Sequence, residues 1–364
     1  MTKPTQHLHD LGQSLWLDNI TRGLLTSGTL SRYIQDFSVT GLTSNPTIFD
    51  HAIKNTHDYD DAIHRKSREG KSGETLVFEL ALEDLRQAAD LFRPIHDQTK
   101  GVDGWVSLEV SPLLAHDAVG TLAAAKALNA RAGRPNLFIK IPGTDEGLAA
   151  IEEAIFEGVP VNVTLLFSGA QYQAAADAYL RGIERRIAAG LNPVVGCVAS
   201  IFISRWDVAV RDKVPASLRD QLGIAVAGQT YQAYRSLIDS PRHARLVKAG
   251  ARRQRLLWAS TGTKDPASCD VLYVEALAAP DTINTMPEAT LKAFADHGKV
   301  CDTLDRSASR SDEVLAEFAK AGIDAQELAA RLQQEGAESF AKSWKDLMDC
   351  IASKSTTAHK TVAV

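Results

Sequence analysis

Short apolar runs alternate with longer segments of helical periodicity along most of the chain. Strands buried in a parallel sheet appear as short apolar runs, whereas amphipathic helices repeat apolar residues about every three to four positions. Runs of the first kind occupy residues 14–19, 38–46, 104–112, 136–143, 160–168, 194–202, 255–261 and 281–287. Repeated strand–helix alternation indicates βαβ units and a parallel sheet. We therefore predict an α/β fold, a single (β/α)8 TIM barrel.

The widest gap between predicted strands covers residues 51–103. It is polar and periodic, and residues 74–92 form a clear amphipathic pattern. We predict an elaborated helical insertion between strands 2 and 3. A doubly wound open sheet is the alternative, but no GxGxxG follows the first strand.

The length of 364 residues exceeds the roughly 250 of a typical barrel, which accepts long insertions within one domain. No internal repeat and no Pro/Gly-rich linker is present. We therefore predict one domain over residues 1–364. The small polar residues of 353–364 predict a frayed tail, and the motif HLHD at 7–10 is placed in a loose N-terminal tail.

Composition is ordinary for a soluble globular protein, with 45% hydrophobic and 23% charged residues. The net charge of -5 argues against a dedicated nucleic-acid binder. No run approaches a membrane span and no signal-peptide pattern opens the chain, so we expect a cytoplasmic protein without a membrane partner. Four cysteines without a CxxC pair indicate neither a zinc site nor a disulfide framework.

The most basic run covers residues 242–255. A solvated helix face is the favoured interpretation. A local field that attracts anionic sugars and a nucleic-acid patch are the alternatives, and the absence of aromatic residues for base stacking argues against the last.

Lys140 stands among apolar residues in the fourth predicted strand. A lone ammonium in a low-dielectric core loses its proton, and a neutral lysine is a nucleophile. The alternatives are that Lys140 reaches solvent with its end group, or that Glu109 forms a structural ion pair with it. Such a pair would keep the lysine protonated.

Further polar residues gather at the predicted carboxyl ends of the strands, where barrel enzymes carry their catalytic groups. They are Asp18, Asn19, Thr43, Ser44, Asn45, Glu109, Asn162, Thr164, Ser200, Ser204, Arg205, Ser260 and Thr261. A neutral lysine that attacks a ketone forms a Schiff base, and two carboxylates supply the acid and base for the following steps. An arginine fork holds a phosphate through charge-assisted hydrogen bonds.

The motifs LWLDN, GLTSNPTIF, SLEVSP, NLFIKIPGT, VNVTLLFS and ASIFISRWD occur in this order along the chain. Together they resemble the strand motifs of transaldolases, in a longer bacterial form, over roughly residues 10–345. The resemblance implies a transferase that moves a dihydroxyacetone unit from fructose 6-phosphate or sedoheptulose 7-phosphate to an aldose phosphate. It implies a place in the pentose phosphate pathway and the use of neither a metal nor an organic cofactor.

The resemblance also implies roles for single residues. Lys140 resembles the Schiff-base lysine, and Asp18 matches the base for C–C cleavage. Glu109 matches the carboxylate that shuttles protons through a water held by Thr164. Asp18 as a cap of the next helix is the alternative for that residue.

Four residues match substrate-binding positions of the family. Asn45 and Asn162 match the amides that hold the dihydroxyacetone hydroxyls, while Ser200 and Arg205 match the phosphate site. For Asn45 the alternative is an ordinary turn residue, and for Arg205 it is a surface pair with Asp207.

One departure concerns the seventh strand. Shorter transaldolases place another arginine just after it, whereas this chain reads ASTGTKDP. Either Lys264 substitutes for that arginine, or the phosphate rests on Arg205 with Ser260.

Two other functions remain open on the sequence. A fructose 6-phosphate aldolase-like enzyme needs the same lysine and aspartate but releases free product. A sugar-phosphate-binding sensor barrel is the non-enzyme alternative. The histidines avoid the strand-end motifs, which argues against a metal-dependent aldolase. We expect a monomer or a homodimer.

Overall fold

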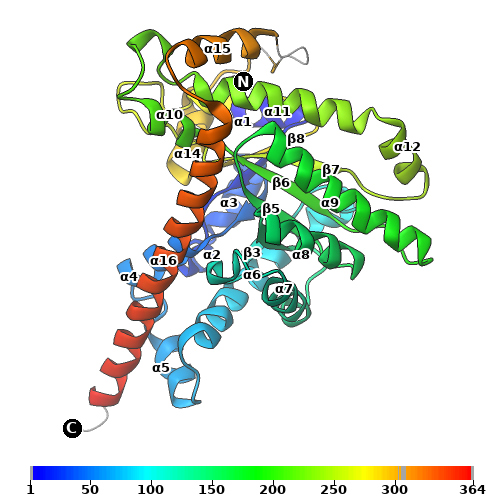
Figure 1. Cartoon of the computed structure of the whole chain (residues 1–364). Helices are drawn as coiled ribbons and strands as arrows, with labels where there is room; N and C mark the ends of the chain where they lie inside the picture. The colour runs from blue at the N-terminus through cyan, green and yellow to red at the C-terminus, as the bar shows by residue number, and fades with distance from the viewer. Residues whose placement is uncertain (1–2, 302, 305–308, 362–364) are drawn as a thin grey trace.

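The computed structural model describes residues 3–301, 303–304 and 309–361. Within them, eight parallel strands close into a barrel in which each strand pairs with the next and β1 pairs with β8. This confirms the predicted (β/α)8 fold (Figure 1). The strands are β1 Ser14–Leu17, β2 Val39–Thr43, β3 Val106–Glu109, β4 Leu137–Pro142, β5 Val161–Leu166, β6 Cys197–Phe202, β7 Gln254–Ala259 and β8 Thr282–Met286.

Side-chain alternation along the strands decides which residues enter the barrel. Successive side chains of a strand point to opposite faces of the sheet. In β4, Leu137 and Ile139 pack outward into the larger core, whereas Phe138 belongs to an inner cluster with Trp16 and Trp105. Lys140 is two residues beyond Phe138, so it points inward as well. The inner aromatic cluster fills the amino-terminal end of the barrel and leaves the carboxyl ends for polar groups.

Helices cover the outside of the barrel, and both faces of the strands are therefore buried. The connecting helices are α2 Arg22–Thr26, α3 Thr29–Asp36, α7 Ala118–Ala132, α8 Asp145–Phe156, α9 Gly169–Ala188, α10 Ser204–Val210, α11 Leu222–Ile238, α12 Pro241–Lys248, α13 Leu272–Ala276, α14 Glu288–His297 and α15 Ser309–Lys320. Two short 3-10 turns, η1 Pro112–Leu114 and η2 Ala216–Leu218, complete the connections.

Three helices form the connection between β2 and β3, as predicted. They are α4 Pro46–Asn55, α5 Asp60–Arg68 and α6 Gly73–Gln98. The apolar face of α6, which includes Leu80, Leu85 and Phe92, is completely buried, and this burial explains the periodicity of its sequence.

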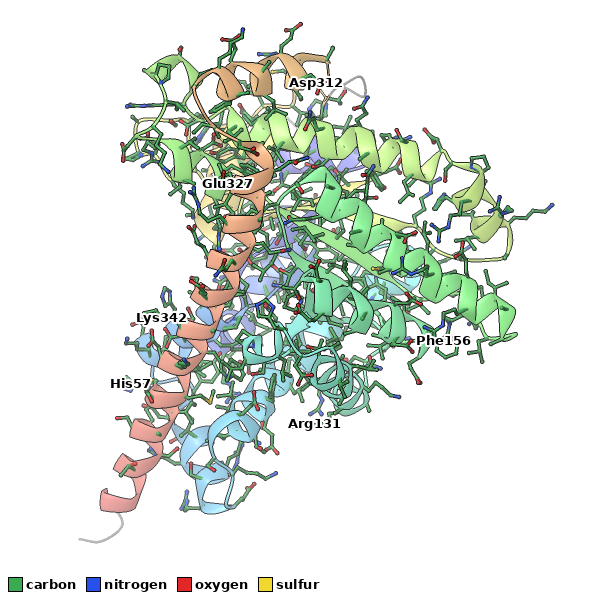
Figure 2. All side chains as sticks on the ribbon, viewed as in Figure 1. His57, Arg131, Phe156, Asp312, Glu327 and Lys342 are labelled. Atoms are coloured by element: carbon green, nitrogen blue, oxygen red, sulfur yellow. The ribbon has the colours of Figure 1, made fainter. Side chains whose placement is uncertain are left out.

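The long helix α16 Ala325–Thr361 was not part of the sequence prediction. It runs from the neighbourhood of α10 past the barrel to α4 and α5 (Figure 1). Figure 2 shows Glu327 and Lys342 along it, with His57 beside its lower part. There Lys354 donates a hydrogen bond of 3.0 Å to the Thr56 carbonyl. The helix continues into the segment predicted to be frayed. Fraying of its end stays a prediction, and residues 362–364 lie outside the described residues.

The N-terminal tail differs from the prediction. The motif HLHD lies at the end of a helix, α1 Pro4–Asp10, instead of a loose segment. Pro4 occupies the first helical position, and the buried Leu8 joins the core where α1 packs against β1 and α14. The prediction was wrong because burial of the single residue Leu8 is enough to hold this short helix against the core. No helix in the described part of the chain has the length and apolarity needed to cross a bilayer.

Candidate active site

A cavity of about 380 Å³ opens at the carboxyl ends of the strands. Residues predicted for the site come to it from seven different segments of the chain. Those that line it are Asp18, Asn45, Lys140, Thr164, Ser200, Arg205, Ser260 and Lys264. Glu109 and Asn162 lie behind this lining.

Lys140 occupies the centre of the site. Its side chain comes from β4, opposite Glu109 on β3 and Asn162 on β5 in the strand register. The ammonium group lies 3.0 Å from Glu109 Oε2 and donates a hydrogen bond of 3.0 Å to the Ser44 carbonyl. Lys140 is only 5% exposed, and the exposed part faces the cavity.

The ion pair between Lys140 and Glu109 was one of the structural alternatives, and it is present. Glu109 is buried, and this burial raises the pKa of its carboxyl group although nearby Lys140 lowers it. A carboxylate with a raised pKa accepts a proton more readily. The pair is therefore also the arrangement in which the lysine can pass its proton to Glu109 and become a nucleophile.

Buried polar oxygens at this pair and on the next strand lack hydrogen-bond partners within the described residues. Apart from the ion pair, neither oxygen of Glu109 has a hydrogen-bond partner in the described residues. The hydroxyl of Thr164, on β5 and at the cavity wall, is likewise buried and unpaired. Buried polar atoms in proteins normally have a partner, often an ordered water.

Asp18 follows β1 at the other side of the cavity. Its Oδ1 accepts a hydrogen bond of 2.9 Å from the Thr43 hydroxyl. Burial raises the pKa of Asp18, and the positive charge of Lys140 opposes this shift. The alternative that Asp18 caps the next helix is wrong, because Thr21 accepts the capping hydrogen bond of α2 from Leu24.

Asn45 caps a helix and also lies at the cavity. Its Oδ1 accepts a hydrogen bond of 3.0 Å from the Ile48 backbone and caps α4, while the residue lines the cavity. Asn162 is completely buried, and both its amide oxygen and its amide nitrogen form hydrogen bonds. It accepts a hydrogen bond of 2.7 Å from Ser200 and donates one of 3.1 Å to Ser107. The Ser200 hydroxyl therefore stands between Asn162 and the cavity.

Arg205 is the second residue of α10, and its guanidinium lies over two aromatic rings. Its guanidinium lies 5.1 Å from the centre of the Phe202 ring and 5.6 Å from that of Phe340. Burial lowers the pKa of Arg205. The alternative pair with Asp207 is wrong, because Asp207 accepts a hydrogen bond of 2.8 Å from Tyr273 and no carboxylate of the described chain forms an ion pair with Arg205.

Both candidates for the missing arginine lie at the cavity. Ser260 adopts a left-handed backbone conformation, with φ of 58°, and shares a hydrogen bond of 2.9 Å with Ser204. Lys264 is near enough to Asp18 that its charge lowers the pKa of that carboxyl. Lys264 and Arg205 bring two positive charges to the cavity and Ser260 lines it as well, a combination suited to a phosphate.

Several other residues that line the cavity were not predicted from the sequence. They include Thr47, His51, Phe202, Pro287 and Phe340. His51 and Phe340 come from α4 and α16, whose positions over the barrel depend on tertiary packing. Thr285 at the end of β8 was also missed. Its hydroxyl lies 3.1 Å from that of Thr43, which was among the predicted strand-end residues, and the position of Thr285 at a strand end could have indicated it.

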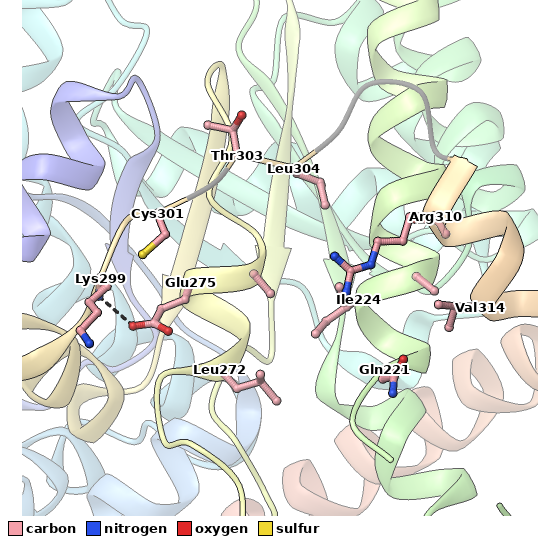
Figure 3. Close-up of a pocket in the computed structure, with 13 residues that line it drawn as sticks. Gln221, Ile224, Leu272, Glu275, Lys299, Cys301, Thr303, Leu304, Arg310 and Val314 are labelled. Atoms are coloured by element: carbon pink, nitrogen blue, oxygen red, sulfur yellow. Dashed lines mark hydrogen bonds between the residues drawn. The ribbon is translucent and has the colours of Figure 1, made fainter. Parts of the chain in front are cut away.

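Neither a second cavity nor any cluster of metal-binding side chains in the described residues points to another catalytic site that contains the predicted residues. A cavity of about 550 Å³ between α11, α13 and α15 contains none of the predicted residues (Figure 3). In the described ranges no group of three or more His, Cys, Asp or Glu side chains is arranged to hold a metal ion.

Known proteins resemble this chain over nearly its whole length. The family described as "Transaldolase/Fructose-6-phosphate aldolase" matches residues 15–351. The "Transaldolase" of Arthrobacter sp. (strain FB24) is 42% identical over 99% of this chain and 100% of its own length. The "Transaldolase" proteins of Saccharopolyspora erythraea and Thiobacillus denitrificans are each 44% identical over 94% of this chain, and the match covers 95% and 98% of their lengths.

Proposed function

The chain belongs to the transaldolase/fructose-6-phosphate aldolase family and is an enzyme with transaldolase activity, and from this premise we propose that Lys140 carries the transferred unit as a Schiff base. The observation that supports this role is the buried ion pair of 3.0 Å between Lys140 and Glu109 at the floor of a cavity that Asp18 also lines. The sensor alternative is set aside with the family assignment.

The first stage is formation of the imine. Glu109 takes a proton from Lys140, whose neutral Nζ then adds to the C2 carbonyl of a ketose phosphate. The carbinolamine loses water to give the iminium. Glu109 and a water at Thr164 carry the protons, and the unpaired oxygens of both residues support this assignment.

The second stage breaks and forms the C–C bond. Asp18 takes the proton of the C4 hydroxyl, the C3–C4 electrons move into the iminium, and an aldose phosphate leaves. The enamine that remains on Lys140 then attacks the aldehyde carbon of the acceptor, while Asp18 returns the proton to the new hydroxyl. Water hydrolyses the imine and releases the new ketose phosphate.

We assign the remaining residues to binding. Asn45 contacts the dihydroxyacetone hydroxyls directly. Asn162 acts on them through Ser200, whose hydroxyl donates a hydrogen bond of 2.7 Å to Asn162. Arg205 holds the phosphate. Ser260 and Lys264 complete that site in place of the arginine found in shorter relatives.

The test separates transfer from simple cleavage. Fructose 6-phosphate and erythrose 4-phosphate should give sedoheptulose 7-phosphate and glyceraldehyde 3-phosphate at equal rates. Without erythrose 4-phosphate, glyceraldehyde 3-phosphate should be released in a burst of about one equivalent of enzyme, while the dihydroxyacetone unit stays bound to Lys140. Continuous release of dihydroxyacetone without an acceptor would instead support the aldolase alternative.

We propose that the reaction needs neither a metal nor an organic cofactor, because the iminium supplies the electron sink. Activity should be unchanged after prolonged dialysis against EDTA. Loss of activity that a divalent cation restores would contradict the proposal. We further propose that the protein acts in the cytoplasm on soluble sugar phosphates, and a monomer or homodimer stays the prediction for its assembly.

A further inference from the structure

Helix α16 touches the two strand ends that carry Lys140 and Thr164. The side-chain amide of Gln333 donates two hydrogen bonds of 2.9 Å, one to the Gly143 carbonyl and one to the Leu165 carbonyl. A glutamine amide has two N–H donors, and both are used here. Gly143 follows β4 directly, and Leu165 follows Thr164 in β5.

The backbone at Leu165 needs such support. Leu165 is buried and has a φ of 58°, in the left-handed region that residues other than glycine seldom adopt. The register between β5 and β6 shifts between Val163 and Leu166, so a bulge lies at this point. Strained conformations persist only where the surroundings hold them, and they often re-aim a neighbouring side chain.

The bulge sets the position of Thr164. Gly143 donates its backbone N–H to the Thr164 carbonyl at 2.7 Å, and Gln333 binds the carbonyls of Gly143 and Leu165. Gly143 therefore binds the Thr164 carbonyl directly, and Gln333 holds both Gly143 and Leu165, the residue that follows Thr164. Its hydroxyl is the buried, unpaired group at the cavity wall.

An independent feature shows that α16 lies very near this point. Gly336 is on the next turn of the helix. A Cβ atom there would lie 2.9 Å from a Leu165 methyl group and 3.2 Å from Arg205 Nη1, so glycine permits the approach. Phe340, one further turn on, lines the cavity and stacks on Arg205.

We propose that Gln333 is a positioning residue that fixes Thr164 relative to Lys140 and Glu109 by holding the left-handed bulge of β5. Gln333 itself does not line the cavity. Its effect falls on the steps that move protons through Thr164, which are imine formation and hydrolysis. The inference rests on the roles proposed above for Lys140, Glu109 and Thr164.

The test uses two substitutions of similar size. Gln333→Met keeps the length of the side chain and removes both donors. Gln333→Glu places a carboxylate against two carbonyl oxygens and regains one donor only when it is protonated. Gln334→Ala is the matched control, because Gln334 is the exposed neighbouring glutamine that bonds only to Glu338, at 3.0 Å, within the described chain.

The measurement is the single-turnover rate of imine formation with fructose 6-phosphate, quenched by borohydride, beside steady-state kcat and KM. A displacement near 1 Å can cost about 100-fold in rate. Gln333→Met should slow imine formation by roughly 10- to 100-fold while KM changes less than about 3-fold. Relative to the unmodified enzyme at each pH, Gln333→Glu should recover as the pH falls from about 8 to about 5.5. Gln334→Ala should behave like the unmodified enzyme.

A different result overturns the proposal. If both Gln333 variants form the imine at the unmodified rate and only their thermal midpoints fall, Gln333 has a purely structural role. An equal slowing in Gln334→Ala would also overturn it. If the unmodified enzyme traps no adduct at Lys140, the proposed function fails, and that result is distinct from either of these.

Discussion

Two carboxylates in one site have environments that suit different tasks. Glu109 is buried behind Lys140 and has no hydrogen-bond donor beyond that lysine in the described structure. Asp18 stands at the cavity itself, accepts from Thr43, and lies in the field of three cations. Burial raises both pKa values, so both groups can hold a proton nearer to neutral pH than exposed carboxyls do.

Loss of either carboxylate should block a different step of the reaction. Asp18→Ala should still form the imine but stall before cleavage, because its base for the C4 hydroxyl is gone. Glu109→Gln should slow imine formation and hydrolysis, since the lysine proton has no acceptor. A general acid or base contributes typically about 100- to 10,000-fold. Borohydride trapping and single-turnover cleavage would measure the two steps. Absence of adduct in Asp18→Ala together with normal trapping in Glu109→Gln would reverse the roles.

Arg205 should act through the phosphate alone. A hydrogen bond to a charged group contributes roughly 1.5–3 kcal/mol, and each ~1.4 kcal/mol is tenfold. Arg205→Ala should therefore lower kcat/KM for fructose 6-phosphate by roughly 10- to 150-fold and leave unphosphorylated fructose almost unaffected. Arg211→Ala is the matched control, because Arg211 follows the same helix and pairs with Asp265 at 3.7 Å. An equal loss with both donors would remove Arg205 from the phosphate site.

At the scale of elements, a buried aspartate joins α10, α11 and α13. Asp207 of α10 accepts hydrogen bonds of 2.9 and 3.2 Å from the first backbone N–H groups of α11, at Leu222 and Gly223. It accepts a third from Tyr273 of α13. Burial raises the pKa of Asp207 to about 6, although these donors lower it. The arrangement fixes the helix that carries Arg205.

This aspartate should make stability depend on pH. Its folded pKa of about 6 lies above an ordinary unfolded value near 3.9, so the folded state binds more protons between these limits. The free energy of unfolding should therefore fall as pH rises from about 4 to about 6, by roughly 3 kcal/mol, and then level off. Asp207→Asn should lack this part of the slope. Denaturant titrations of both proteins across this range give the difference, and a gap that changes in the opposite direction would show a lowered pKa.

At the scale of the whole molecule, local pattern predicted the strands and the helices that connect them, but not the long helix α16 that packs over the barrel. The eight apolar runs correspond to the eight strands, and strand alternation turns Lys140, Glu109 and Thr164 inward. To predict that a residue lies at the carboxyl end of the barrel, only the position and direction of its strand must be known. These residues could therefore be predicted from the sequence. Asn162 shows the limit, because its depth behind Ser200 depends on the packed register of β5 and β6.

Contacts between segments far apart in the chain could not be predicted from local sequence pattern. Gln333 bonds to a residue 190 positions away, and Phe340 and His51 reach the cavity from helices outside the barrel. Helical periodicity predicts that α16 has a buried face but not which part of the barrel that face meets. Local pattern therefore predicted which strand-end residues lie at the cavity, and the structure adds the lining residues from α4 and α16 and the contact made by Gln333.

The most direct test of the account is the identity of the lysine that becomes covalently bound. Reduction with borohydride in the presence of fructose 6-phosphate, followed by peptide mapping, should place one three-carbon unit on Lys140, in the peptide that contains FIKIPG. Lys140→Arg should form no adduct and have no activity, because arginine is not deprotonated in proteins. Labelling of another lysine, such as Lys264 at the same cavity, or undiminished turnover by Lys140→Arg would contradict the account.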